Sequence, residues 1–209
     1  RGFWDFGTGA LGDMACHIMD LAFWALDLQC PTAVSCEGPE VHPDGAPAWV
    51  KAIYDFPAHG DIGPIKFHWS DGGKHFDIVE KSMDMYNRPL STWGLGILFV
   101  GDKGMLAADY GKKLLLPKDQ FADFQPPDPS IPDSVGHWVE WVQACKTGSP
   151  TTCNFDYAGR LTETVLLGIV AFRSGEKLVW DPDTLTATNT DKAAQFVDKP
   201  YRKGWELAT

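Results

Sequence analysis

The sequence lacks a long hydrophobic run: no apolar stretch approaches the roughly 20 residues that a membrane-spanning helix needs. It also lacks an initiator methionine and a basic segment that leads into an apolar stretch, so no export signal is recognisable. The abrupt opening "RGFWDFG" indicates a mature or excised piece of a longer protein. The sequence therefore predicts no membrane partner and leaves the compartment open between cytoplasm and periplasm.

Basic charge is also scarce, with 18 lysines and arginines against 28 aspartates and glutamates. The net charge is −10 and the isoelectric point is about 4.9. Nucleic acids and anionic membrane surfaces attract proteins through a basic footprint, which this composition does not supply. Both classes of partner are excluded on this basis.

Cysteines are few and irregularly placed. There are five, at Cys16, Cys30, Cys36, Cys145 and Cys153, and none of them forms a CxxC pair. An odd count with wide spacing argues against a disulfide framework and against a structural zinc site. Free thiols of this kind are typical of a reducing compartment.

A nucleotide-binding motif is missing as well. The sequence contains neither a P-loop nor a strand followed by GxGxxG and a helix. The glycines of "FGTGALG" do not follow a buried strand, and a polar stripe begins directly after them. No cofactor-binding residue is therefore expected in this chain.

The hydrophobic pattern that is present predicts an α+β fold. Alternating apolar residues predict strands in the first half, and 3.6-residue periodicity predicts two helices in the second half, after one at the start. The expected helices are about 10–27, 135–148 and 156–175, and the expected strands lie within 32–41, 49–56, 65–70, 96–117 and 176–181. Because strands and helices do not alternate, the expected architecture is a large, mostly antiparallel open sheet with helices on one face.

We expect residues 1–209 to form a single domain with two less regular parts. Residues 74–95 are glycine-rich, polar and aperiodic, which predicts a long surface loop of the kind that often covers a site. Residues 196–209 form an aromatic and basic tail that must dock on something to be ordered.

The first helix carries a polar stripe. At about 100° per residue, Asp13, His17, Asp20 and Trp24 fall within about 60° of one another. One interpretation is an acid/base pair, in which Asp13 holds the His17 imidazole by a charge-assisted hydrogen bond. A second is a solvated polar edge whose residues pair with each other. A metal site is less well supported, because D-x3-H supplies only two ligands.

Aromatic residues outside the stripe are further candidates. Tryptophan rings stack on sugar faces, but they also fill cores and lids. Trp4, Trp69 and Trp93 are open to both interpretations, and Asp71 follows Trp69 where a strand enters the long loop.

The stretch "GTGALGDMACHIMD" resembles the C-terminal domain of the Gfo/Idh/MocA oxidoreductases. The blocks "WDFGTGALGDMACH", "LFVGDKGML", "DYAGRLTETVLLG" and "YRKGW" are similar to the branch found in Bacteroidetes and Planctomycetes. The resemblance implies an enzyme that oxidises a hydroxyl of a sugar, cyclitol or glycoside with NAD or NADP. It implies that His17 is the acid/base and that Asp13 orients it. The expected substrate contacts are Trp4, Thr8, Asp20, Trp69 and Asp71.

The family's NAD(P) lies in an N-terminal Rossmann domain with a glycine-rich loop and an E-K-P segment, which this chain does not contain. The resemblance therefore implies a substrate-binding and oligomerisation half that binds no cofactor and is inactive alone. It also implies a homo-oligomer formed through the sheet face. Two alternatives stay open: redox-linked glycosidase chemistry in the full-length protein, and a non-enzymatic carbohydrate-binding or assembly module that kept the fold.

Overall fold

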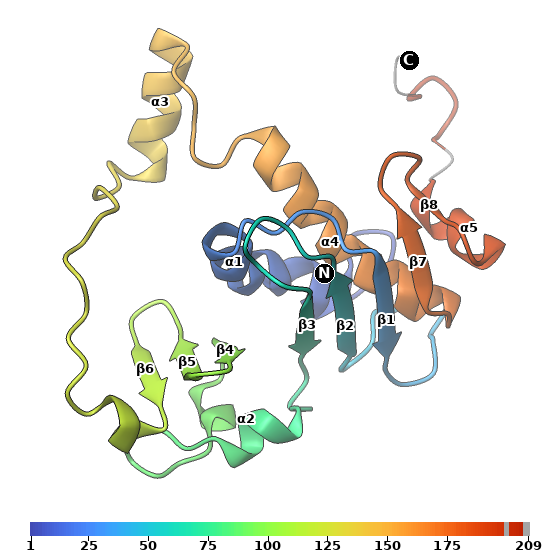
Figure 1. Cartoon of the computed structure of the whole chain (residues 1–209). Helices are drawn as coiled ribbons and strands as arrows, with labels where there is room; N and C mark the ends of the chain where they lie inside the picture. The colour runs from blue at the N-terminus through green and yellow to red at the C-terminus, as the bar shows by residue number, and fades with distance from the viewer. Residues whose placement is uncertain (199–200, 207–209) are drawn as a thin grey trace.

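The computed structural model describes residues 1–198 and 201–206 (Figure 1). Its helices are α1 (Gly9–Ala25), α2 (Asp77–Lys81), α3 (His137–Thr147), α4 (Phe155–Ser174) and α5 (Ala194–Val197), with 3₁₀ turns η1 (Leu90–Trp93), η2 (Lys118–Phe121) and η3 (Asp191–Ala193). Its strands are β1 (Ala33–Glu37), β2 (Lys51–Phe56), β3 (Ile65–Ser70), β4 (Ile97–Gly101), β5 (Gly104–Ala108), β6 (Lys113–Leu116), β7 (Leu178–Asp181) and β8 (Thr186–Ala187).

The larger sheet has the strand order β3-β2-β1-β7-β8, with antiparallel pairing throughout. Helices α1 and α4 pack against each other, and α4 also contacts β1 and β2. Together they form one helical layer beside the sheet (Figure 1). The predicted α+β fold with a mostly antiparallel sheet is therefore confirmed.

The strands divide between two sheets, whereas the sequence predicts one large sheet. β4, β5 and β6 form a separate three-stranded antiparallel sheet. This sheet has its own small apolar cluster, built around Leu90, Ala107 and Leu116. Tight turns join β4 to β5 and β5 to β6, so each finds its partner locally and none pairs with β3.

The main core lies between the larger sheet and the helical layer. On α1 the residues Leu11, Ala15 and Met19 recur at four-residue spacing and are at most 1% exposed. They meet apolar residues of α4 and the fully buried Tyr54 of β2. Burying such a face contributes about 1.5–3 kcal/mol for each large side chain, which is far more than helix propensity supplies.

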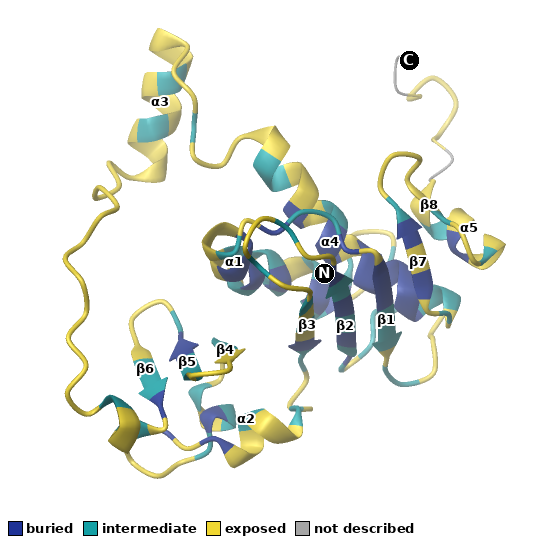
Figure 2. Cartoon of the chain, viewed as in Figure 1, coloured by how far each residue is buried: buried dark blue, intermediate teal, exposed yellow. Residues whose placement is uncertain are grey.

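Helix α3 lies where the sequence predicts it but buries none of its side chains against another described element. It ends at Gly148, whose φ of +71° is the left-handed conformation that glycine adopts without strain. No residue of α3 is buried, although Trp138 and Trp141 belong to its apolar face (Figure 2). In the described structure α3 stands apart from the sheets on two exposed segments (Figure 2).

Residues 74–95 are more ordered than the predicted loop, since they contain α2 and η1. Asp84 is 2% exposed and holds this segment together. Its carboxylate accepts hydrogen bonds from the backbone N–H of Tyr86 (2.8 Å) and of Arg88 (3.0 Å). The Arg88 guanidinium also donates to it, at 3.0 and 2.7 Å. The hydrogen bonds to this buried carboxylate therefore order a segment whose sequence shows no apolar periodicity.

We expect Asp84→Asn to lower the thermal unfolding midpoint at neutral pH, because an amide cannot accept all four of these bonds. The bonds from Arg88 hold the pKa of the Asp84 carboxyl well below its usual range. A carboxyl with a lowered pKa stabilises the fold above about pH 4, and this stabilisation is lost as the pH falls further. Unfolding midpoints of both proteins should therefore converge in acid. A difference that stays constant from neutral to acidic pH would refute this role.

None of the described helices is both long and apolar enough to cross a membrane. The predicted tail, 196–209, falls partly outside the described residues, namely at 199–200 and 207–209. Within its described part, residues 201–206 are exposed, and Trp205 retains 68% of its accessible surface.

Candidate functional site

The polar stripe lies on the solvent-facing side of α1. Asp13, His17 and Trp24 are exposed, and Asp20 is half-buried. The buried residues Leu11, Ala15 and Ala22 lie about 180° away around the helix. The alternation of exposed and buried positions therefore presents the stripe outward, where a second domain or a ligand can reach it.

Within the described residues no hydrogen bond joins Asp13 to His17, the bond on which the acid/base interpretation depends. Instead, the Arg1 guanidinium forms an ion pair with the Asp13 carboxylate, whose side chain is 43% exposed. Within the described residues no hydrogen bond engages the His17 imidazole, so both of its ring nitrogens are available to a ligand. An exposed ion pair of this kind contributes at most about 1 kcal/mol, so a ligand can displace Arg1 at small cost.

Asp20 binds a residue far along the chain. The hydroxyl of Tyr157, in the first turn of α4, donates to Asp20 Oδ1 at 2.6 Å. Burial, and after it this hydrogen bond, raises the pKa of Tyr157 well above its usual range. Asp20 therefore ties α1 to the start of α4, which leaves it less free to bind a substrate than Asp13.

We expect Tyr157→Phe to destabilise the full chain by about 1 kcal/mol, because the half-buried Asp20 carboxylate loses its short hydrogen bond. Urea unfolding measures this difference. Asp20→Asn keeps an acceptor for the tyrosine and should cost less than Tyr157→Phe. Equal stability of Tyr157→Phe and the unaltered protein would show that the contact contributes nothing.

Trp4 and Thr8 lie in the segment that precedes α1. Trp4 Nε1 donates to the backbone carbonyl of His42 at 2.9 Å. The Arg173 guanidinium lies 4.8 Å from the Trp4 ring centroid and 4.4 Å from that of Phe196. One face of the tryptophan is thus occupied by a cation–π contact. Thr8 is the residue before α1, and its side chain makes no capping hydrogen bond.

Trp69 and Asp71 pair with each other at the end of β3. Trp69 is 7% exposed, and its Nε1 donates to Asp71 Oδ2 at 2.9 Å. Asp71 Oδ1 accepts the backbone N–H of Val50 at 2.8 Å. Both side chains therefore stabilise the strand end. Their polar atoms are already used, although the sequence predicts them as substrate contacts.

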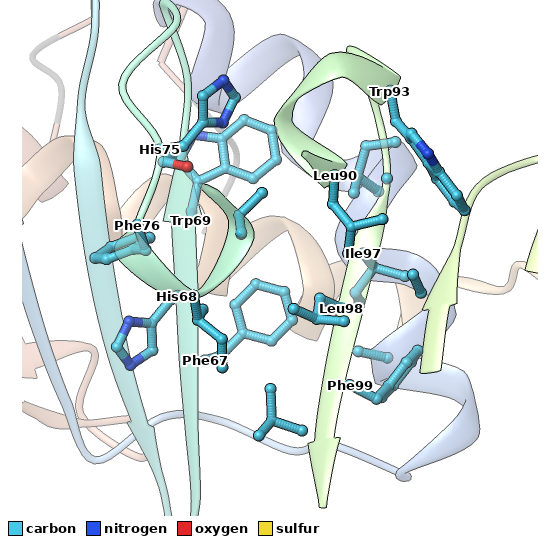
Figure 3. A pocket seen from close by; sticks show the side chains of 18 of the residues that line it. Phe67, His68, Trp69, His75, Phe76, Leu90, Trp93, Ile97, Leu98 and Phe99 are labelled. Atoms are coloured by element: carbon cyan, nitrogen blue, oxygen red, sulfur yellow. The ribbon is translucent and has the colours of Figure 1, made fainter. Parts of the chain in front are cut away.

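A large apolar cavity of about 710 Å³ lies between the edge strands β3 and β4 (Figure 3). Phe67 and Trp69 line it from β3, and Ile97 and Leu98 line it from β4 (Figure 3). α1 contributes Ile18 and Ala22, and Leu26, the residue that follows it, also lines the cavity. These three positions point about 140–220° away from Asp13 around the helix, so the cavity lies across α1 from the stripe.

The structure thus separates the predicted site residues into two groups. The stripe collects Asp13, His17 and Asp20, whereas Trp69 belongs to the cavity. Sequence reasoning did not find the cavity, because its walls come from segments that pair in different sheets. The one local signal was the uninterrupted apolar run "ILFV" of β4, which is typical of a strand that has apolar neighbours on both faces.

The glycines just before and at the start of α1 lie close to other atoms of the chain. A Cβ at Gly7 would approach the Arg1 backbone to 2.8 Å, and one at Gly9 would approach Ala46 Cβ to 2.8 Å. A Cβ at Gly12 would clash with the Thr8 side chain. These glycines therefore make room for the chain's own atoms. The described residues also contain no cluster of three or more His, Cys, Asp or Glu side chains that would hold a metal ion.

A comparison with known protein families finds a match to the part of the chain that carries the stripe. Residues 1–62 match the family described as "Oxidoreductase family, C-terminal alpha/beta domain", the C2 form of the Gfo/Idh/MocA C-terminal domain. The search of curated proteins found no match. The matched segment runs from the start of the chain through α1, β1 and β2, and so contains the whole stripe. Residues 1–62 are therefore similar to a C-terminal alpha/beta domain of the Gfo/Idh/MocA oxidoreductases.

Proposed function

We propose that this chain is the substrate-binding and catalytic-helix domain of an NAD(P)-dependent oxidoreductase that acts on a hydroxyl of a sugar, cyclitol or glycoside. The observation that carries the proposal is the exposed Asp13–His17 stripe on α1, within the segment that matches the oxidoreductase family. An exposed carboxylate and an exposed imidazole one helical turn apart can both reach hydroxyls of a polyhydroxylated substrate, and an imidazole is the most frequent general acid or base.

In this proposal His17 takes the proton of the substrate hydroxyl as the attached carbon is oxidised to a carbonyl. The hydride from that carbon goes to an acceptor of the NAD(P)⁺ class, which the family generally binds in its N-terminal domain. Asp13 lies one helical turn before His17. Once a ligand displaces Arg1, the Asp13 carboxylate is free to accept a hydrogen bond from a neighbouring substrate hydroxyl or from the imidazole N–H of His17.

The test uses the full-length protein with a panel of sugars, cyclitols and glycosides, and with NAD⁺ and NADP⁺ supplied separately. The proposal expects reduced nicotinamide to accumulate with at least one substrate. Release of the aglycone without net nicotinamide reduction would instead identify redox-linked glycosidase chemistry. Saturable sugar binding with neither product would overturn the proposal in favour of a carbohydrate-binding module.

A further inference from the structure

The cavity between β3 and β4 follows the edges of both strands. All six residues of β3, 65–70, and all five residues of β4, 97–101, line it. Adjacent residues of a strand point to opposite faces of their sheet. A space that touches every one of them therefore runs along the strand edge and not over one face. The cavity thus lies between two strand edges (Figure 3).

In the described part of the chain, neither edge has a strand partner on the cavity side. β3 pairs with β2, β4 pairs with β5, and each is the end strand of its sheet. The β4–β5 hairpin closes with the pair Gly101 and Gly104, and hydrogen-bonded pairs alternate with non-hydrogen-bonded ones from there. This alternation directs the backbone N–H groups of Leu98 and Val100 away from β5, toward the cavity.

The two strands lie in the same layer of the molecule. Phe67 of β3 and Phe99 of β4 both pack against the main core. Leu98 packs on the other side, in the cluster around Leu90. The cavity is apolar on both sides, since it is lined by Ala22 of α1 toward the core and by Leu90 opposite. A strand placed between β3 and β4 would continue this layer, with alternate side chains facing each apolar side.

The volume of the cavity is close to that of one strand. Five strand residues extend about 17 Å, neighbouring strands lie about 4.8 Å apart and stacked layers about 10 Å apart, which together enclose roughly 800 Å³. The cavity measures about 710 Å³. A standard interface between two proteins takes about 20–30 residues from each side, which is far more than this cavity holds. It therefore fits one short extended segment, and not the face of a second copy of the chain.

The lining gives a ligand few charged partners. Lys66 forms an ion pair with Asp55, and the ring of His68 packs against that of Phe76 with their centroids 4.8 Å apart. Recognition then depends on backbone hydrogen bonds and apolar contacts, which an extended peptide supplies. The long exposed segment before α3, 122–136, is a poor source of this peptide, because its four prolines cannot donate to a strand edge.

We propose that the cavity binds an extended peptide segment of a partner protein, which pairs with β3 on one side and with β4 on the other. The backbone of this segment bonds to the free N–H and C=O groups of both edges, and its side chains are apolar on both faces. Such strand addition joins the two sheets into one. The cavity lies across α1 from the stripe, so the proposal does not depend on the proposed oxidoreductase function.

Three dye-labelled peptides test the proposal on the full-length protein by fluorescence polarisation. The first, KKVIVIVKK, is apolar on both faces, and the second, KKVTVTVKK, is polar on one. The third repeats the first but carries N-methyl groups on its two isoleucines, which removes the N–H donors along one edge. We expect the second and third peptides to bind at least about tenfold more weakly than the first. Equal binding of the first and third would overturn strand pairing, and equal binding of the first and second would overturn the two-sided apolar site.

Hydrogen exchange on the unaltered protein locates the peptide. Amides of β3 and β4 that face the cavity should exchange quickly in the free protein and slowly when the first peptide is bound. β6 is also an edge strand but does not line the cavity, so its exchange should not change. Slow exchange of these β3 and β4 amides before peptide is added would show that the two strands pair directly, and would overturn the proposal. Unchanged exchange in both strands would overturn it as well.

Val100→Pro removes one of the N–H groups that face the cavity. Val100 is 59% exposed on an edge strand, where proline is tolerated. The variant should bind the first peptide at least about fivefold more weakly. Val100→Ala is the matched control, because it keeps the N–H group and should bind as the unaltered protein does. Equal binding by the two variants would overturn the assignment of this edge.

Discussion

Replacing His17 by alanine should lower kcat of the full-length protein by about 10²–10⁴-fold, the usual contribution of a positioned general acid or base. The imidazole is exposed on α1, and no hydrogen bond occupies it within the described residues, so it is free to accept a proton from a bound hydroxyl. The measurement is substrate-dependent reduction of NAD(P)⁺ at saturating substrate. KM should change far less than kcat, because His17 is proposed to act on the reacting proton and not on the rest of the substrate.

His137→Ala is the matched control. His137 is also an exposed histidine on a helix, but it begins α3 and lies outside the segment that matches the oxidoreductase family. The kcat of the His137→Ala variant should equal that of the unaltered protein. Retention of most activity in His17→Ala would remove this residue from the mechanism. Equal losses in both variants would point to a general effect on folding.

Much of the fold could be predicted because its signals are local. Leu11, Ala15 and Met19 recur at helical spacing, and Asp13 and His17 between them are exposed, so both the helix and its outward stripe follow from periodicity. Gly148 and Gly175 end α3 and α4 in the left-handed conformation, as expected of glycines after an apolar helix. These features depend on residues at most a few turns apart.

The contacts that define the surroundings of the stripe are not local. The partner of Asp20, Tyr157, lies 137 residues away along the chain. The partner of Asp13 is Arg1 and not His17, although the four-residue spacing favours the histidine. Spacing gives the direction of a side chain, but the choice among several partners depends on where distant segments pack. The same holds for β4, whose apolar run predicts a strand without saying which sheet it joins.

Gly168→Ala should destabilise the protein by about 1–3 kcal/mol, the usual cost of adding a methyl group to a filled core. A Cβ at this position of α4 would lie 2.2 Å from the Tyr54 hydroxyl and 2.7 Å from Leu11 Cδ2. Three elements of the core, α1, α4 and β2, meet at this point. Because Leu11 is on α1, the added methyl group should push against the helix that carries Asp13 and His17. Urea unfolding measures the stability loss, and kcat should fall with it.

Gly159→Ala is the matched control, because Gly159 is an exposed position of the same helix and a Cβ there meets no atom within 4 Å. It should stabilise the protein by about 1 kcal/mol, since alanine is the better helix former. Adding Tyr54→Phe to Gly168→Ala removes the hydroxyl that the new methyl group meets most closely, and should recover part of the loss. The Tyr54 hydroxyl has no hydrogen-bond partner in the described structure, so its removal alone costs little. If both glycine variants stabilise the protein equally, α1 and α4 do not approach each other at Gly168 as closely as this packing requires.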